Sequence, residues 1–306
     1  MSQPAHRLSI CVIAELVGTF ILVLLGLGAV HSAVLTESLT GLWQVGIVWG
    51  IAIMIAIYTI GGVSGAHINP AITIALASWK LFPLGRVVPY ILAQLTGAFL
   101  AAATLFYLFQ PQLTAKENAK GVQRGDPGSI VTAMCYGEFY PAPGGLAAGN
   151  EPLEADALAE YMSTAEAGQG RAFVAEFLGT AILAFLVVAI TDPRNHTQPD
   201  RLAPAFIGLT VAALICVLAP LTQACFNPAR DFGPRLFSML AGWGSAAMPG
   251  PIGFGVISVY IVAPILGATA GAGLYQQLFR DSNVAETVPG RPLVNIDDAP
   301  DQEFPA

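Results

Sequence analysis

The tripeptide Asn-Pro-Ala occurs twice in this chain, at Asn69-Pro70-Ala71 and at Asn227-Pro228-Ala229. An Asn at a helix N-cap accepts hydrogen bonds from the free amides of the first turn, and a Pro at the next position has no N–H that needs a partner. Each tripeptide therefore predicts the start of a helix. Because a short apolar stretch follows each one, we expect one short helix over 69–78 and another over 227–240.

The composition of the chain is that of a membrane protein. Hydrophobic residues make up 55% of its 306 residues and charged residues only 11%, whereas soluble domains carry roughly 25% charged residues. A membrane-spanning helix needs about 20 mostly apolar residues. Six segments meet this requirement: 9–30, 42–60, 86–110, 172–190, 202–219 and 254–279. The sequence thus predicts an all-α membrane protein, and its net charge of −7 argues against a nucleic-acid partner.

A repeated motif divides the chain into two halves. Ala14-Glu15-Leu16-Val17-Gly18-Thr19 is echoed by Ala175-Glu176-Phe177-Leu178-Gly179-Thr180, and an Asn-Pro-Ala tripeptide follows each copy at nearly the same distance. Each half holds three spans, which is an odd number, so the second half enters the membrane from the opposite face and the repeats are inverted. The expected organisation is a first repeat over 1–110, a long extracellular loop over 111–171, a second repeat over 172–280 and a disordered cytoplasmic tail over 281–306. Within the loop, residues 151–167 are compatible with a surface helix.

The two short helices predict a pore. At about 1.5 Å per residue, each reaches only about halfway across a hydrocarbon core of roughly 30 Å. Inversion brings them in from opposite faces, so their capped N-termini meet near the midplane. Irregular backbone at that depth is tolerated where it is buried or lines water, and the Gly-rich stretch 61–68 before the first tripeptide therefore predicts a wet lumen. The carbonyl acceptors expected along it belong to Gly65, Ala66, His67, Gln223, Ala224 and Cys225.

Two Asn-Pro-Ala boxes in inverted halves resemble the major intrinsic protein family of aquaporins and glycerol facilitators. The stretch from Asn227 to Arg235 is similar to the glycerol-facilitator branch, because Asp231 follows Arg230 and a second basic residue comes four positions later. Pro264-Ile265 also fits that branch. The resemblance implies the aquaporin-like fold, a passive channel and a homotetramer with one pore per subunit. It places Asn69 and Asn227 at the pore midplane. No cofactor or metal is expected, because the four cysteines lack metal or redox spacing.

The same resemblance implies an outer selectivity constriction at Trp49, Ile215, Ala224 and Arg230. Ile215 and Ala224 are placed by an ungapped count back from Asn227. Glycerol facilitators usually have an aromatic where this chain has Ala224 and a small residue where it has Ile215. This quartet is more similar to that of plant nodulin-like intrinsic proteins, which pass glycerol and other small neutral hydroxylated solutes. Trp49 has a second interpretation, as an interfacial or lipid-facing aromatic.

Other polar residues within the apolar pattern have two interpretations each. Glu15 and Glu176 lie inside spans, where an acid often indicates function such as proton coupling, but their equivalent places in the repeats favour carboxylates that brace the polar turns. His67 is interpreted as a structural donor or lining group, with a pH gate as the alternative. Pro70, Pro228 and Asp231 are expected to support the half-helices. Cys225 is a candidate site for blocking by mercury.

We expect a passive channel for glycerol and related small neutral solutes, with some water, that excludes ions and protons. The alternatives are a channel mainly for water, ammonia, urea or metalloid hydroxides, and an ion-coupled secondary transporter, which also uses inverted repeats. No enzyme is expected, because no hydrolase, metalloprotease or Cys-x-x-Cys motif occurs. Basic residues in short connections favour cytoplasmic termini in a plasma (inner) membrane; on that side lie Arg7, Lys80, Arg86, Arg194, Arg201, Arg280 and Arg291.

Overall fold

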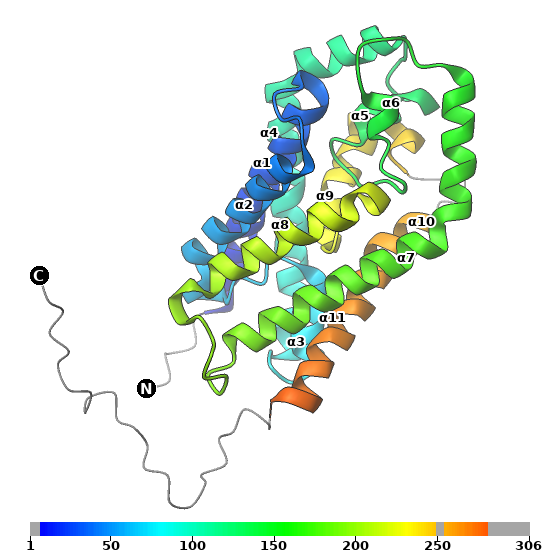
Figure 1. Ribbon diagram of the computed structural model, residues 1–306. Helices are drawn as coiled ribbons and strands as arrows, with labels where there is room; N and C mark the ends of the chain where they lie inside the picture. The colour runs from blue at the N-terminus through cyan, green and yellow to red at the C-terminus, as the bar shows by residue number, and fades with distance from the viewer. Residues whose placement is uncertain (1–6, 249–253, 281–306) are drawn as a thin grey trace, which may run out of the picture.

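The computed structural model describes residues 7–248 and 254–280, and within these ranges the secondary structure is entirely helical. Six helices are long and apolar enough to cross a membrane, and they run side by side along the length of the molecule (Figure 1). Five are α1 (Leu8–Thr36), α2 (Leu42–Ser64), α4 (Val87–Lys120), α7 (Ala155–Thr191) and α8 (Ala203–Thr222). The sixth joins α10 (Phe254–Val256), a π-helical stretch Ile257–Val262, α11 (Ala263–Leu274) and a second π-helical stretch Tyr275–Phe279. The proposed tail over 281–306 lies outside the described residues.

Both short helices begin where the Asn-Pro-Ala boxes predict. Helix α3 (Pro70–Ser78) has Asn69 as its N-cap, and helix α9 (Pro228–Ser238) has Asn227. The second is shorter as an α-helix than the expected 227–240, because it changes to a π-helical turn over Met239–Trp243 in which Gly242 has a φ of 107°. A residue in that left-handed region cannot continue a right-handed helix.

Glycine-lined contacts pack equivalent helices in the two halves. A Cβ atom on Gly97 of α4 would lie 2.3 Å from the carbonyl oxygen of Leu16 in α1, and one on Gly267 of α11 would lie 2.2 Å from that of Phe177 in α7. Leu16 and Phe177 follow the two repeated glutamates in the sequence. Such close backbone contact is typical of membrane helices, where small residues let helices approach.

The expected extracellular loop over 111–171 is largely helical at its two ends. Helix α4 continues through Pro111 to Lys120, and α7 begins at Ala155 and runs unbroken into the fourth span. The expected surface helix over 151–167 is therefore the first part of α7. Only residues 121–154, here called the outer segment, connect the two helices, and they contain the short helices α5 (Ile130–Ala133) and α6 (Gly144–Ala147).

The outer segment folds back over one end of the helices (Figure 1). Lys116 and Lys120 at the end of α4 donate to the carbonyls of Gly149 and Ala148, at 2.7 and 2.6 Å. A buried cluster fixes the segment to the region after α9, and it includes Leu113, Val131, Tyr136, Phe139 and Trp243. The outer segment is thus part of the folded protein rather than an open loop.

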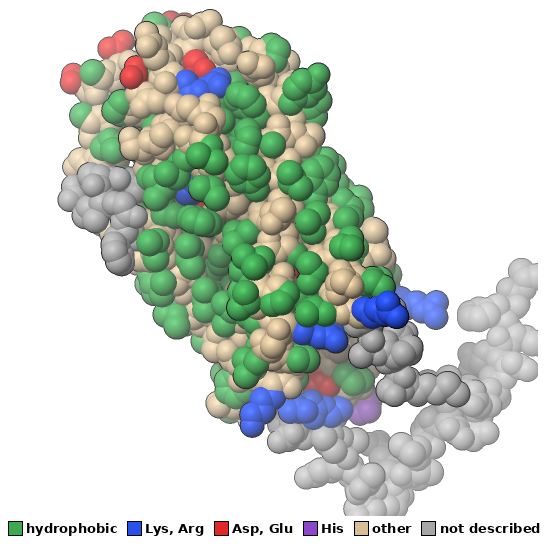
Figure 2. All heavy atoms as spheres, turned by 180° about the vertical axis from the view of Figure 1, so that it is seen from behind, with side chains coloured by type: hydrophobic (Ala, Val, Ile, Leu, Met, Phe, Trp, Pro, Cys, Tyr) green, Lys and Arg blue, Asp and Glu red, His purple; other side chains and the backbone are tan. Residues whose placement is uncertain are grey.

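The surface carries a wide apolar region with charges at the ends. Figure 2 shows hydrophobic side chains over the middle of one face, several Lys and Arg side chains at one end and acidic side chains at the other. Large exposed apolar residues include Ile13, Leu92, Tyr107 and Val217. A contiguous apolar surface of this extent is suited to lipid, and the chain is a multi-pass membrane protein.

Candidate pore and constriction

A cavity of about 290 Å³ lies between the helices and is lined by residues from both repeats. One part of its wall is apolar and comprises Leu22, Ile53, Ile57, Ile72, Leu76, Leu183, Val187, Ile207 and Val211. The polar part comes from α9 and from the two segments that lead into the half-helices, residues 65–68 and 223–226, here called the first and second approach. Its residues are Gly65, Ala66, His67, Ile68, Asn69, Ala224, Cys225, Phe226, Asn227 and Arg230. The cavity therefore has one apolar side and one side that offers hydrogen-bonding groups.

The asparagines of the two boxes are each held from two directions. The Oδ1 of Asn69 accepts from the backbone N–H of Ala71 at 2.8 Å, and its Nδ2 donates across the repeat interface to the carbonyl of Phe226 at 2.8 Å. Asn227 repeats this arrangement, because its Oδ1 accepts from Ala229 and its Nδ2 donates to Ile68 at 2.8 Å. A carboxamide nitrogen has two N–H groups, so each asparagine keeps one for a molecule in the cavity.

The approaches to both boxes use left-handed backbone. In the first approach Gly65, Ala66 and Ile68 have φ values of 86°, 49° and 43°. In the second, Ala224 and Phe226 have φ values of 60° and 54°. Such conformations are uncommon for residues with a Cβ and persist only where the surroundings hold them.

The surroundings that hold these two approaches are the repeated glutamates. Oε1 and Oε2 of Glu15 accept from the backbone N–H groups of His67 and Ile68, at 2.9 and 2.7 Å. Glu176 accepts in the same way from Cys225 and Phe226, at 2.9 and 2.8 Å. Both carboxylates are fully buried, and neither lines the cavity. These contacts favour the bracing interpretation over proton coupling.

Two residues of the expected carbonyl ladder differ in surroundings. His67 lines the cavity, and its Nδ1 lies 3.2 Å from the hydroxyl of Thr73, with the ring packed against Phe82. Gln223 does not line the cavity. Its Oε1 accepts from the backbone N–H of Phe139 at 2.9 Å instead, so this side chain contacts the outer segment.

All four residues of the expected constriction line the cavity: Trp49, Ile215, Ala224 and Arg230. The guanidinium carbon of Arg230 lies 4.2 Å from the ring centroid of Trp49, which is within the range of a cation–π contact. The lipid-facing interpretation of Trp49 is wrong, because its side chain is buried between helices and only 3% exposed. The Trp49 indole and the Arg230 guanidinium therefore lie at the same point of the cavity wall.

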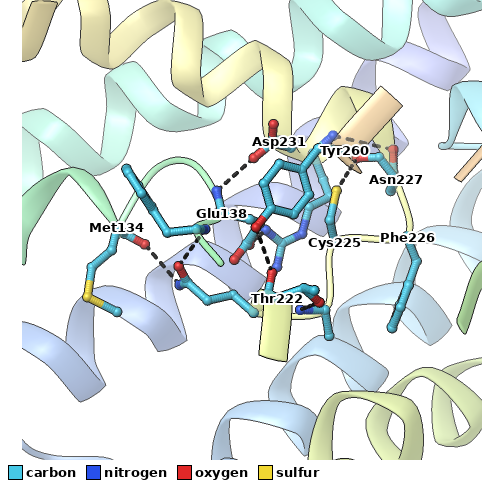
Figure 3. Close-up of polar contacts among 12 residues, drawn as sticks. Met134, Glu138, Thr222, Cys225, Phe226, Asn227, Asp231 and Tyr260 are labelled. Atoms are coloured by element: carbon cyan, nitrogen blue, oxygen red, sulfur yellow. Dashed lines mark hydrogen bonds and ion pairs between the residues drawn. The ribbon is translucent and has the colours of Figure 1, made fainter. Parts of the chain in front are cut away.

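Sequence reasoning missed Glu138 of the outer segment, which forms a buried ion pair with Arg230. Figure 3 shows Glu138 beside Asp231 and near the approach that carries Cys225, Phe226 and Asn227. The available signal was a single acid between Tyr136 and Phe139 in an otherwise apolar stretch.

Asp231 and Arg235 dock the outer segment onto α9. Their side chains form an ion pair one helical turn apart, at 2.6 Å, with both residues fully buried. Asp231 also accepts from the backbone N–H of Glu138 at 2.7 Å, and Arg235 donates to the carbonyl of the same residue. Gly137 makes this approach possible, since a Cβ atom there would lie 2.6 Å from Cζ of Arg235.

At the opposite end of the cavity, Thr191 at the end of α7 lines the wall and is followed by a hydrogen-bonded carboxylate. Asp192 pairs with Arg194 at 2.9 Å and accepts from the hydroxyl of Tyr275 at 3.2 Å. The hydrogen bond from the Arg194 side chain lowers the pKa of Asp192 below its ordinary value. The hydrogen bond from Tyr275 links the end of the fourth span to the end of the sixth.

Six membrane-length helices around a cavity, with two capped half-helices meeting inside it, define a membrane channel of the aquaporin-like fold. The family model "Major intrinsic protein" matches residues 5–275. The chain belongs to the major intrinsic protein family, as the two boxes predicted.

Relatives of this chain include bacterial uptake facilitators. It is 38% identical over 265 residues to the glycerol uptake facilitator protein of Haemophilus influenzae, covering 87% of this chain and 92% of the relative. It is 39% identical over 267 residues to the glycerol uptake facilitator protein of Pseudomonas aeruginosa, covering 87% of each. A propanediol uptake facilitator of Citrobacter freundii is 38% identical over 266 residues, covering 87% of this chain and 90% of the relative.

Among solved structures, the aquaglyceroporin from Plasmodium falciparum matches with a TM-score of 0.72, covering 90% of this chain and 99% of that chain. At 23% identity this likeness shows the fold alone. It confirms the all-α aquaporin-like fold expected from the sequence.

Proposed function

We propose that this protein is a passive channel for glycerol and related small neutral solutes, with some water. The observation that carries the proposal is the two-sided wall at the constriction, where Trp49 and Ile215 face the cavity together with Arg230. A polyol has a carbon chain on one side and hydroxyls on the other. The indole and the aliphatic side chain suit the carbons, while the rigid donor fork of Arg suits the hydroxyl oxygens. The names of the bacterial relatives agree with this solute class.

The midplane supports exclusion of cations and protons. The peptide dipoles of α3 and α9 place about half a positive charge at each N-terminus, and both N-termini point at the cavity beside Asn69 and Asn227. A cation entering this region loses hydration and meets a positive potential. In aquaporin-type pores, selectivity in general depends on positive half-helix ends and on hydrogen-bond donors that line the pore.

The cellular setting is part of the same proposal. The family suggests a homotetramer with one pore per subunit in a plasma (inner) membrane. Basic residues such as Lys80, Arg86 and Arg201 lie in short connections at the end opposite the outer segment, which supports cytoplasmic termini. A protease-accessibility assay on sealed vesicles, with a tag at the N-terminus, tests that orientation.

Flux into reconstituted vesicles tests the proposed function. Stopped-flow light scattering should give glycerol uptake that is linear in concentration, weakly dependent on temperature and independent of ion gradients. Uptake that saturates and follows a proton or sodium gradient would instead support a coupled transporter. The same vesicles are then tested with 1,2-propanediol, urea, ammonia, a metalloid hydroxide and water, which ranks the permeability of the alternative solutes. Arg230→Ala in matched vesicles tests whether the constriction controls this ranking.

A further inference from the structure

Glu138 is a buried acid at the constriction, and it lies outside the two Asn-Pro-Ala boxes and the repeated glutamate motif. Its side chain is 3% exposed and pairs with Arg230, whose side chain is 4% exposed. The second carboxylate oxygen, Oε2, is buried and has no hydrogen-bond partner among the residues that the structure describes. An acid in this position changes the electrostatics of the pore wall even though it does not itself line the cavity.

The position of Glu138 is fixed by its backbone, independently of its side chain. Its N–H donates to Asp231 and its carbonyl accepts from Arg235. The next residue, Phe139, donates from its N–H to Gln223 and lies with its ring 5.3 Å from Cζ of Arg235. These contacts hold the carboxylate next to the guanidinium of Arg230 in the folded protein.

The charge balance of the wall depends on this acid. Asp231 and Arg235 neutralise one another, so without Glu138 the constriction would carry the uncompensated charge of Arg230. The two half-helix N-termini at the midplane add further positive potential. A narrow, poorly hydrated passage with that potential repels cations but concentrates small anions.

We propose that Glu138 is the counter-ion of Arg230 and that it makes the channel exclude small anions as well as cations. It acts by neutralising the charge of Arg230 rather than by touching the solute. The half-helix ends provide the barrier to cations, and the Glu138 carboxylate removes the attraction for anions at the constriction. This inference rests on the proposed channel function and adds a determinant of its selectivity for neutral solutes.

The experiment compares neutral and anionic permeants in the same vesicles. Wild-type protein, Glu138→Gln, Glu138→Asp and Glu151→Gln are reconstituted, and the fluxes of glycerol, nitrate and formate are measured against empty vesicles. Glu151 is an exposed acid in the same outer segment, so its variant removes the same charge away from Arg230. We expect Glu138→Gln to raise anion flux about tenfold while glycerol flux stays within about twofold, and Glu138→Asp and Glu151→Gln to match wild type.

A double variant separates charge from structure. In Glu138→Gln with Arg230→Gln both charges are gone, so anion flux should return to the wild-type level. The proposal is overturned if Glu138→Gln leaves anion flux unchanged, if Glu151→Gln raises it equally, or if the rise persists in the double variant. If Glu138→Gln cannot be recovered in vesicles, the test uses the wild-type protein and Glu138→Asp. The proposal is then overturned if either of them passes anions faster than empty vesicles do. If the wild-type protein passes no glycerol, the proposed channel function is refuted. That result is independent of the anion comparison.

Discussion

A Cβ atom placed on Gly26 would lie 2.2 Å from Cε3 of Trp49, so α1 leaves no free space behind the indole ring at the constriction. On its other side the ring faces Arg230 at 4.2 Å. The ring is therefore confined between a helix backbone and a guanidinium. The glycine of one span thus positions a constriction residue of the next.

We expect Gly26→Ala to narrow the pore. The added methyl group forces the Trp49 ring toward the cavity, because the helix backbone behind it cannot move as easily as a side chain. Glycerol flux should fall about tenfold and water flux less, since only the larger solute needs the full aperture. Gly28→Ala in the same helix is the matched control, because its Cβ would meet only Leu105 at an ordinary 3.6 Å.

A smaller ring tests the cause of that effect. Adding Trp49→Phe to Gly26→Ala removes the atoms that clash, so the double variant should recover glycerol flux relative to Gly26→Ala alone. Equal losses in the Gly26 and Gly28 variants, or no recovery in the double variant, would mean that the ring is not positioned from behind. Stopped-flow light scattering with glycerol and water gives both readings.

Glu176→Gln should destabilise the second approach to the pore. An amide retains one acceptor oxygen but presents an NH₂ group to the other backbone donor, so the N–H of Cys225 or Phe226 loses its partner. An unsatisfied buried N–H costs about 2 kcal/mol, and we expect the thermal unfolding midpoint in detergent to fall by about 5 °C together with glycerol flux. Glu160→Gln on the exposed part of the same helix is the control. An unchanged midpoint would refute the bracing role.

Arg230→Ala should relax the exclusion of solutes at the constriction. The substitution removes the donor fork and its charge, and also opens the space beside Trp49. We expect urea flux and proton flux to rise several-fold above wild type, on the order of fivefold, with pyranine-loaded vesicles reporting the protons. Arg230→Lys keeps the charge and should exclude protons better than Arg230→Ala. Identical solute and proton permeability in wild type and Arg230→Ala would remove this residue from the selectivity filter.

Mercury should block the pore through Cys225. This thiol lines the cavity two residues before Asn227, whereas Cys11, Cys135 and Cys216 do not line it. A bound mercury atom at that point obstructs a single-file passage, so mercuric chloride should abolish most glycerol flux in wild type and in Cys216→Ser. Cys225→Ser should stay open under the same treatment. Equal inhibition of both variants would place the sensitive thiol elsewhere.

The sequence by itself determined the features that depend on local chemistry. Membrane spans follow from runs of apolar residues, and the starts of α3 and α9 follow from an Asn cap beside a Pro. The repeat of Glu15 and Glu176 also indicated that both approaches are built alike, because the same local motif has the same partners in each half. These features need no knowledge of distant contacts.

Only the tertiary structure decided which residues share the wall and its charge. Sequence reasoning left open the face on which Trp49 lies, expected the backbone carbonyl of Gln223 along the pore and treated Glu138 as part of a long loop. Packing buries the Trp49 ring, leaves Gln223 outside the cavity wall with its side chain bonded to the outer segment, and pairs Glu138 with Arg230. Each outcome depends on contacts between segments far apart in the chain, such as the docking of residues 137–139 on Asp231 and Arg235. Hydropathy and capping are read from neighbouring residues, but an ion pair between distant segments exists only once the fold has brought them together.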